Sequence, residues 1–339
     1  MATDVAQVEI ETTPCLLCGE TAHAPLMRTC DRLCRLPGKF ELVRCVACGL
    51  VYLSPRPTVE SIGRYYPDGY DPFITTRLED LPLLKRLSVR YGLLKRCRLV
   101  GSYRQSGRLL DVGCATGLFL TEMRRRPGWQ VMGVEPGASA AEFARATYGL
   151  DVYSGDLPSA RYPDAFFDVV TMWDVLEHLH APVSVLGEVR RILRDDGLLI
   201  LRTPSLDSFD ARLFGPYWAG LDSPRHLALY SRCTAGRLLE RAGFSPTRIS
   251  TGSGSFLHCS LSFGFWLDAA VSLPLVKGGL LALARGWPAR FALALPLMLT
   301  DSLGLGSEMM IVARPVNPLP TRRTTHYDRD MASTDPLVG

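Results

Sequence analysis

The feature that most constrains the fold is an alternation of short apolar runs with helical stretches between residues 107 and 255. Such alternation is typical of βαβ units around a parallel sheet. Gly149, Gly197 and Gly243 lie close behind expected helix ends, where glycine commonly stops a helix. The pattern predicts strands at Arg108–Val112, Gln130–Glu135, Asp151–Tyr153, Asp168–Trp173, Gly197–Arg202 and Thr247–Ser250, and helices at Leu118–Arg126, Ala138–Tyr148, Pro182–Arg194 and Thr234–Ala242.

The chain has 339 residues and a net charge of +4, and 47% of its residues are hydrophobic. That length suggests about two domains and a large core, while the mild charge gives no argument for nucleic-acid binding. The first residues, MATDVAQVEIETTP, are polar and acidic without the apolar stretch of a signal peptide, so we expect a cytoplasmic protein. Ten cysteines in a reducing compartment more often bind metal than form disulfides.

Two matched cysteine pairs stand within the first 50 residues. Two residues separate Cys15 from Cys18 and likewise Cys45 from Cys48, and a glycine follows each second cysteine. This spacing lets both thiolates of a pair contact one ion, and two such pairs form a closed tetrahedral site for a structural zinc. Four unrelated core thiols or one redox-active pair are the alternatives. The intervening stretch of 26 residues, which holds two further cysteines, implies an inserted loop.

The first strand of the alternating region runs into a turn of small residues and then into a helix. Gly113, Ala115 and Gly117 let the backbone approach a ligand closely, and the helix N-terminus can accept a carboxylate. Glu135 closes the next expected strand, where a carboxylate can bind two ribose hydroxyls. A dinucleotide fingerprint would need glycine in place of Leu118, so room for a pyrophosphate is poorly supported.

An ordered series of motifs carries a family resemblance. The series reads LLDVGCATG, GVEPG, SGDL, FFDVVTMWDVLEHL and GLLILRTP. Together these motifs resemble a class I S-adenosylmethionine-dependent methyltransferase over residues 107–313. The CxxCG…CxxCGLVY head and the segment around His226 further resemble a bacterial subgroup with a zinc ribbon, whose members act on small molecules, sugars or lipid-linked intermediates.

The resemblance implies a fold and a division of the chain. The family has a Rossmann-like seven-stranded α/β sheet whose last strand is antiparallel, and Met309–Ala313 is well placed to be that strand. We expect an N-terminal zinc ribbon and a helical insertion before this last strand. The expected parts are a zinc-ribbon region at 1–54, a helical linker or lid at 55–106, the methyltransferase domain at 107–314 with its apolar insertion at 256–300, and a disordered tail at 315–339.

The resemblance also implies which residues bind S-adenosylmethionine. Asp111 and Gly113 would lie near its amino-acid end, and Glu135 would bind the ribose. Ala115 stands where the family often has glycine, and one methyl group is tolerable there. The other matched positions are Gly117 in the turn, Asp156 and Leu157 beside the adenine (a simple turn carboxylate being the alternative for Asp156), and Met172, Trp173 and Asp174 beside the sulfonium.

Methyl transfer from a sulfonium requires alignment of the two reactants and, for a hydroxyl acceptor, removal of a proton. His178 is the first candidate base because it follows a central strand and histidine titrates near neutral pH, and Glu177 is a candidate to orient it. His226, in an aromatic and proline-rich loop, is the second candidate. Alternatively, Glu177 and His178 cap a loop and brace the cofactor, and His226 packs near the surface. His180 and His258 lack comparable context and are expected to be structural.

Residues 256–300 are unusually apolar, although charged residues interrupt them often enough that no membrane-spanning helix is expected. One interpretation is an interfacial helical hairpin on a membrane, assisted by the basic helical segment 85–98. The interpretation we favour is a homodimer interface or a cap over the substrate pocket. Tyr65, Tyr66 and Tyr70 are expected to pack in a core, with a lid over the donor as the alternative.

These features predict a methyltransferase whose acceptor is a small molecule, through a hydroxyl of a sugar, a lipid-linked compound or a polyketide-like compound. An RNA methyltransferase that grips RNA through the zinc ribbon is an alternative from another class. Against it, the fourth strand ends in WDVLEH rather than the N/D-P-P-Y/F used for exocyclic amino groups, and the zinc region is not strongly basic, so we expect no nucleic-acid partner. A protein that binds the cofactor without turnover is the third hypothesis.

Overall fold

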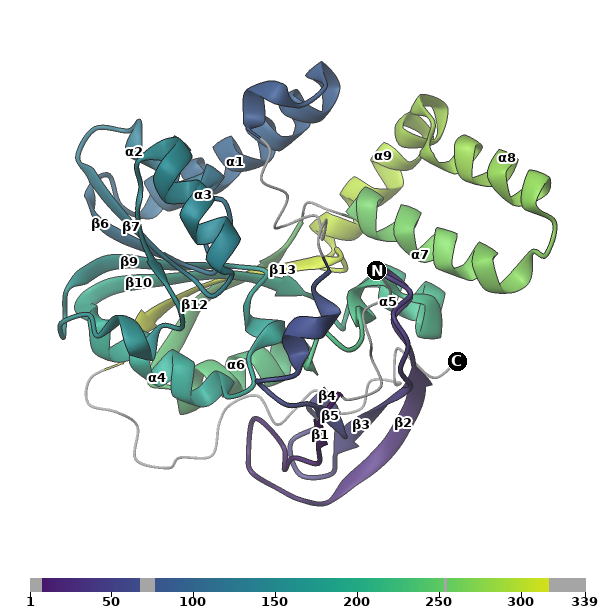
Figure 1. Cartoon of the computed structure of the whole chain (residues 1–339), viewed down its shortest axis with the longest axis horizontal. Helices are drawn as coiled ribbons and strands as arrows, with labels where there is room; N and C mark the ends of the chain where they lie inside the picture. Colours follow the sequence, from purple (N-terminus) through teal and green to yellow (C-terminus); the bar gives the residue numbers. More distant parts are fainter. Residues whose placement is uncertain (1–7, 68–76, 253–254, 317–339) are drawn as a thin grey trace.

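A computed structural model describes residues 8–67, 77–252 and 255–316. Its central sheet is built from β6 (Gly107–Val112), β7 (Trp129–Glu135), β8 (Asp151–Ser154), β9 (Phe167–Trp173), β10 (Leu193–Pro204), β12 (Phe244–Thr251) and β13 (Glu308–Pro315). The strands lie in the order β12-β13-β10-β9-β6-β7-β8 (Figure 1). Strands β6 to β10 pair in parallel, and β13 runs antiparallel to both of its neighbours. The predicted α/β fold with a reversed last strand is therefore confirmed.

Helices cover both faces of this sheet (Figure 1). One face packs against α1 (Leu83–Tyr103), α2 (Leu118–Arg124) and α3 (Ala138–Tyr148), in a core that includes Cys97, Leu120 and Ala144. The other face packs against α4 (Pro182–Ile192) and α6 (Arg232–Arg241), in a core that includes Leu186 and Leu238. The carboxyl ends of the parallel strands remain accessible to the loops that follow them.

Local chemistry explains where the predicted and observed helices differ. Helix α3 has the predicted bounds, and Gly149 ends it in the left-handed conformation. Helix α6 begins two residues earlier than predicted because the Ser231 side chain accepts a hydrogen bond from the backbone N–H of Thr234. Helix α4 ends two residues earlier than predicted because Leu193 already has the extended backbone of β10.

Helix α1 forms where an apolar and basic helical pattern predicts it, but the periodic apolar residues are not the buried ones. Leu84, Leu87 and Tyr91 are exposed, whereas Leu93 and Cys97 face the core. The reason is that the core of the sheet reaches only the C-terminal half of this helix.

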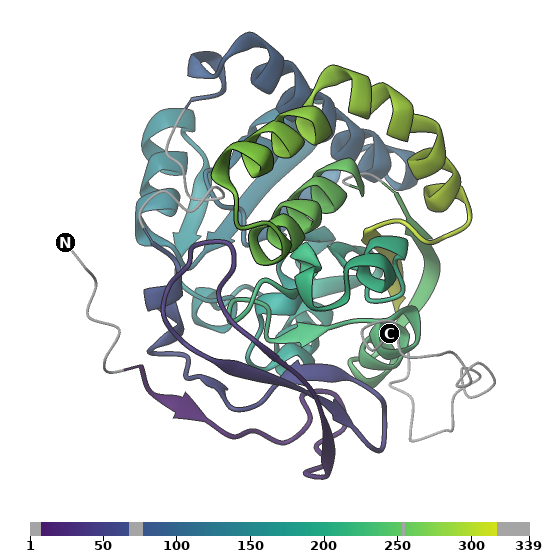
Figure 2. The ribbon, with the colours of Figure 1, turned by 90° about the vertical axis from the view of Figure 1, so that its right-hand side faces the viewer.

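A second sheet joins the N-terminal region to a distant part of the chain. It has the strand order β11-β4-β3-β2, and a separate two-stranded ladder pairs β1 with β5. The strands are β1 (Ile10–Glu11), β2 (His23–Thr29), β3 (Phe40–Cys45), β4 (Val51–Leu53), β5 (Arg56–Pro57) and β11 (Ala228–Leu229). Beyond the β11–β4 ladder, the backbone N–H of Leu53 donates to the carbonyl of Leu227 at 2.9 Å. Both ribbon views show this sheet against the body of the molecule (Figures 1 and 2).

A buried ion cluster holds the same two regions together. The guanidinium of Arg225 is fully buried and donates to both carboxylate oxygens of Asp31, at 3.0 and 2.7 Å. It also donates to both oxygens of Asp222, at 3.0 and 2.7 Å, and to the carbonyl of Tyr65 at 2.8 Å. Since Asp31 comes from the loop between β2 and β3, this one side chain fixes that loop against residues 222–226.

The helical insertion predicted before the last strand is present as three helices, α7 (Ser255–Ala270), α8 (Pro274–Arg285) and α9 (Trp287–Ser302), rather than a two-helix hairpin. Helix α7 packs beside α5 (Phe209–Phe214), while α8 and α9 project away from the body (Figures 1 and 2). Leu275, Leu295 and Met298 are among the exposed apolar side chains of α8 and α9. No helix in the described part of the chain has the length and apolarity to cross a membrane.

The ion cluster gives a stability prediction. Replacing Arg225 by alanine leaves two buried carboxylates without their counter-ion, so the free energy of unfolding should fall by about 3 to 5 kcal/mol. Urea unfolding followed by circular dichroism measures this change. The matched control is Arg248→Ala, which removes an exposed arginine and should change the free energy of unfolding by less than about 0.5 kcal/mol. Equal effects of the two substitutions would contradict this role for the cluster.

Candidate functional site

The turn after β6 adopts an unusual backbone that its small residues permit. Gly113, Ala115 and Gly117 have φ angles of 71°, 46° and 78°, in the left-handed region. A Cβ on Gly113 would lie 2.6 Å from a methyl carbon of Val175, so no larger residue fits without a rearrangement. Alanine accepts the left-handed conformation at a cost of about 1 to 2 kcal/mol. The turn ends at the N-terminus of α2, at the carboxyl edge of the sheet.

Glu135, the predicted ribose ligand, lies directly beside this turn. Its carboxylate accepts hydrogen bonds from the backbone N–H groups of Ala115 at 2.8 Å and Gly137 at 2.7 Å. Glu135 is buried, and burial raises its pKa despite these hydrogen bonds. The structure thus brings together the turn and the acidic strand end that sequence analysis had linked only by their spacing.

The other predicted cofactor residues have varied surroundings. Thr171 donates to the Asp111 carboxylate at 2.6 Å, and burial raises the pKa of Asp111 to about 7. Met172 and Trp173 are buried. Asp156 is exposed and accepts a hydrogen bond from the N–H of Ser159 at 2.9 Å, as a turn carboxylate does, while Leu157 beside it is buried.

The carboxylate of Asp174 is held by two arginines. Arg202 Nε donates to Asp174 Oδ1 at 2.7 Å, and the Arg96 guanidinium lies 3.6 Å from Oδ2. Although burial alone would raise the pKa of Asp174, these cations lower it. The guanidinium carbon of Arg96 also lies over the ring of Trp173, 4.9 Å from the ring centroid. The sequence of α1 does not mark which of its basic residues turns toward the sheet, so Arg96 could not be predicted as a site residue.

The three predicted catalytic residues, Glu177, His178 and His226, lie close together in the structure although they come from two distant parts of the sequence. Glu177 and His178 lie in a 3-10 turn, Leu176–His178, directly after β9. The rings of His178 and His226 lie 4.7 Å apart between centroids, at 77° to each other. One ligand atom from each histidine and one from the Glu177 carboxylate all lie within 4.8 Å of one another. We call these three residues the Glu177–His178–His226 cluster.

Backbone and side-chain partners fix this cluster. His178 Nδ1 lies 3.0 Å from the carbonyl oxygen of Arg225, and His226 Nδ1 lies 2.8 Å from that of Gly220. Thr203 donates to Glu177 Oε2 at 2.9 Å, while Glu177 Oε1 is buried and has no hydrogen-bond partner in the described part of the chain. Burial lowers the pKa of His178 to about 3, which keeps its imidazole neutral, and burial raises the pKa of Glu177 well above its usual value.

Two further residues near the cluster were not predicted as site residues. Tyr66, expected to pack in a core, places its hydroxyl 3.0 Å from Nδ1 of His178; Tyr70 lies outside the described residues. His258, expected to be structural, forms an ion pair with Glu308 at 2.7 Å. Burial alone would lower the pKa of His258, but the Glu308 carboxylate raises it. The apolar context of His258 in the sequence concealed a charged partner that is 50 residues away.

The four predicted metal ligands also converge. Cys15 and Cys48 have their sulfurs 3.4 Å apart, Cys18 and Cys45 have theirs 3.5 Å apart, and all four lie within 4.8 Å of one another. Each pair sits in the same turn, since the N–H groups of Gly19 and Gly49 donate to the carbonyls of Cys15 and Cys45 at 2.9 and 3.0 Å. Four sulfurs that surround one point fit a tetrahedral zinc ion, which would supply structural cross-linking and no open coordination position.

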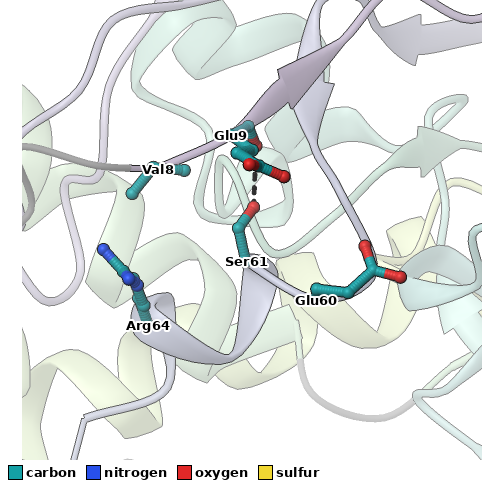
Figure 3. A pocket seen from close by; sticks show the side chains of 5 residues that line it. All are labelled: Val8, Glu9, Glu60, Ser61 and Arg64. Carbon is teal, nitrogen blue, oxygen red and sulfur yellow. Dashed lines mark hydrogen bonds between the residues drawn. The ribbon is translucent and has the colours of Figure 1, made fainter.

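A surface cavity beside the N-terminal strands lies apart from the predicted site residues. Val8, Glu9, Glu60, Ser61 and Arg64 line a space of about 470 Å³, and Ser61 donates to the carbonyl of Glu9 at 2.7 Å (Figure 3). None of the predicted site residues lines this cavity, so we assign it no part in the chemistry.

Comparison with known proteins agrees with the fold and the turn. Residues 85–249 match the family model described as a methyltransferase domain. This part of the chain is a class I S-adenosylmethionine-dependent methyltransferase domain. The match includes the glycine turn, Glu135 and the Glu177–His178 pair, whereas the cysteine pairs and His258 lie outside it.

Two curated relatives and one solved structure illustrate the similarity. The chain is 30% identical over 148 residues to a protein of Mycolicibacterium smegmatis named "Probable S-adenosylmethionine-dependent methyltransferase". The matched stretch covers 42% of this chain and 54% of that protein. It is 31% identical over 160 residues to indolepyruvate C-methyltransferase of Streptomyces griseus, and the matched stretch covers 43% of this chain and 48% of that protein. Geranyl diphosphate C-methyltransferase from Streptomyces coelicolor has a TM-score of 0.45 at 14% identity, covering 66% of this chain and 80% of that one. The chain thus spans about half the length of the curated relatives it matches.

The cysteine cluster predicts the metal content of the chain. The purified protein should contain one zinc ion per chain, measured by plasma mass spectrometry, and Cys48→Ser should lose it. Cys30→Ser is the matched control because Cys30 lies in the intervening loop, outside the cluster, and its zinc content should stay unchanged. Folded wild-type protein without zinc, or zinc retained by Cys48→Ser, would refute the four-thiolate site.

Proposed function

We propose that this chain transfers a methyl group from S-adenosylmethionine to a hydroxyl of a polar small molecule. The observation that carries the proposal is the position of the Glu177–His178–His226 cluster at the carboxyl edge of the sheet, directly after the strand that ends beside Asp174. Open α/β sheets bind their ligands at this edge. The cluster therefore lies where an acceptor would meet the methyl group.

The donor side of the proposed site follows from the turn after β6. Glu135 would exchange its hydrogen bond from Ala115 for the ribose hydroxyls, and Asp111 would lie near the amino-acid end of the cofactor. The turn's backbone allows close approach, so the donor would be held against the sheet edge. When bound, S-adenosylmethionine supplies an activated methyl group, and the protein's own task is alignment.

The acceptor side is polar and largely shielded from water. Glu177, His226, Glu308 and Thr203 are buried there. Among the described residues, Glu177 Oε1 and Glu308 Oε2 have no hydrogen-bond partner, although Arg202 Nε lies 3.8 Å from Glu308 Oε2. Unpaired buried acceptors are costly, and hydroxyl groups of a bound molecule would satisfy them. This polarity supports a hydroxylated acceptor of the sugar, lipid-linked or polyketide-like classes. The cluster would bind the reacting hydroxyl and assist loss of its proton, with His178 as the first candidate to receive it.

Turnover is tested by incubating the chain with S-adenosylmethionine and a panel of nucleotide sugars, hydroxylated polyketides and structured RNA, and measuring S-adenosylhomocysteine. Release with a hydroxylated small molecule supports the proposal. Release with RNA alone would overturn it in favour of nucleic-acid modification.

Glu135→Ala gives a prediction for the cofactor. If Glu135 binds two ribose hydroxyls, its loss removes two hydrogen bonds to a charged group, and the affinity for S-adenosylmethionine should fall roughly 100-fold or more in calorimetric titration. Glu142→Ala, an exposed carboxylate on α3, is the matched control and should bind normally. NAD should bind to neither protein. Unchanged affinity of Glu135→Ala would refute the ribose assignment.

We further propose that α8 and α9 form a contact between two copies of the chain. Leu275, Leu295 and Met298 are 92%, 76% and 66% exposed, which is unusual for side chains of this kind. Lys277 of α8 pairs with Asp268 of α7, and Arg285 and Arg290 add two positive charges to these helices. An exposed apolar surface of this kind is typical of a contact between protein chains, and two copies of one chain can form such a contact symmetrically.

Light scattering tests this contact. The wild-type chain should have the mass of a dimer, and the double substitution Leu275→Glu with Leu295→Glu should give a monomer because it places charges in the apolar surface. A wild-type monomer that co-sediments with phosphatidylglycerol vesicles would instead support the membrane interpretation and contradict the dimer.

A further inference from the structure

The Glu177–His178–His226 cluster brings one ligand atom from each of its three side chains within 4.8 Å of one another. A carbonyl oxygen can only accept a hydrogen bond, so the Nδ1 atoms of His178 and His226, beside the carbonyls of Arg225 and Gly220, carry the ring hydrogens. When Nδ1 carries the ring hydrogen, Nε2 of the same neutral ring is an acceptor.

Glu177 adds acceptor atoms to this group. Its Oε2 receives the hydroxyl hydrogen of Thr203, and its Oε1 is buried with no partner among the described residues. The carboxylate of Asp222 lies 3.9 Å from Nε2 of His226, beyond hydrogen-bond distance. Acceptor atoms this close together in a buried place repel one another unless a cation or a donor lies between them.

We propose that Glu177, His178 and His226 bind one divalent cation. Two histidine nitrogens and one carboxylate oxygen on one side of an ion leave its remaining coordination positions open. The hydrogen bonds from both Nδ1–H groups to backbone carbonyls, and from Thr203 to Glu177, are the partners that orient metal-binding side chains. The nearby charge of Asp222 favours a cation further.

The cation gives the acceptor a more specific chemical identity. This inference rests on the proposed function and deepens it. With the cation bound, His178 would act on the acceptor by holding the ion, and the ion rather than the imidazole would promote loss of the hydroxyl proton. An acceptor with two neighbouring oxygen atoms, such as a vicinal diol or a hydroxyketone, could bind the ion through both. Coordination would lower the pKa of the bound hydroxyl and align it with the methyl donor.

The site differs in chemistry from the cysteine cluster, which makes the two separable. Thiolates prefer zinc, whereas imidazole and carboxylate ligands also bind Mn²⁺, which competes poorly for four cysteines. Mn²⁺ therefore serves as the probe, and the sample is the full-length chain with one equivalent of zinc, which the four thiolates bind in preference to imidazole and carboxylate. The loss of the sharp electron paramagnetic resonance signal of free Mn²⁺ measures binding without any methyl donor or acceptor.

The wild-type chain should bind one Mn²⁺ saturably. Glu177→Gln, which keeps the shape of the side chain, and the double substitution His178→Ala with His226→Ala should each weaken binding at least tenfold. His180→Ala is the matched control, because His180 lies two residues from His178 but its Nε2 is 3.1 Å from the carbonyl of Pro57. Its Mn²⁺ affinity should equal that of the wild type. All variants should retain one zinc ion per chain and the wild-type circular dichroism spectrum.

Absence of saturable Mn²⁺ binding by the zinc-loaded wild type would overturn the proposal, as would equal Mn²⁺ affinity in Glu177→Gln, whose fold the spectrum verifies. These outcomes are independent of S-adenosylmethionine binding and of turnover. A chain that binds S-adenosylmethionine but no Mn²⁺ refutes the cation site alone, and a chain that binds Mn²⁺ but no S-adenosylmethionine refutes the methyltransferase function alone.

Discussion

The buried contact of Arg225 with Asp31 and Asp222 is the interaction on which the candidate site depends. The side chain of Arg225 joins the loop between β2 and β3 to residues 222–226, while its backbone carbonyl contacts Nδ1 of His178. One residue therefore links the N-terminal region to the orientation of a candidate catalytic ring. A buried arginine between two carboxylates tolerates little displacement, because any opening leaves a charge unpaired. The ion cluster therefore holds in place the backbone carbonyl that orients the ring of His178.

The N-terminal cysteine ribbon participates in the same arrangement. The segment that follows His226 is tied on both sides, since the N–H of Leu227 donates to the carbonyl of Glu177 at 2.7 Å and its carbonyl accepts from Leu53 at 2.9 Å. Leu53 ends β4, which pairs with β3, and β3 ends at Cys45. A metal bound by the four cysteines would thus stabilise a sheet whose edge strand positions His226. The cysteine ribbon can therefore influence the chemistry through the position of His226, without touching the acceptor. This structural role does not require a basic surface.

The parts of the fold that could be predicted from sequence are those fixed by local chemistry. The turn from Gly113 to Gly117, the strand end at Glu135 and the spacing of the cysteine pairs each depend on neighbours within a few residues, and periodicity located nearly all strands of the central sheet. Arg225 could not be predicted in the same way, because its partners are 3 and 194 residues away. The same holds for Tyr66 beside His178 and for His258 beside Glu308, where a residue with an ordinary local context gains its role from a distant partner. On α1 periodicity identified the helix but not its buried side, since a helix that extends past its sheet exposes apolar residues that obey the same spacing.

Charge at the sheet edge explains why the proposed site can be rigid before any ligand binds. Asp174 is neutralised by Arg202 and Arg96, and Glu308 by His258, so the strongest charges beside the acceptor already have partners. Among the described residues, Oε1 of Glu177 is buried without a hydrogen-bond partner, and one ligand atom of Glu177 lies within 4.8 Å of one from each of His178 and His226. A sulfonium donor carries its own positive charge and needs only carboxylates on its side of the site, which Asp111 and Glu135 can supply. Transfer of a methyl group between two such surfaces depends mainly on alignment, and a site whose charged residues hold one another in place loses little entropy when it aligns the reactants.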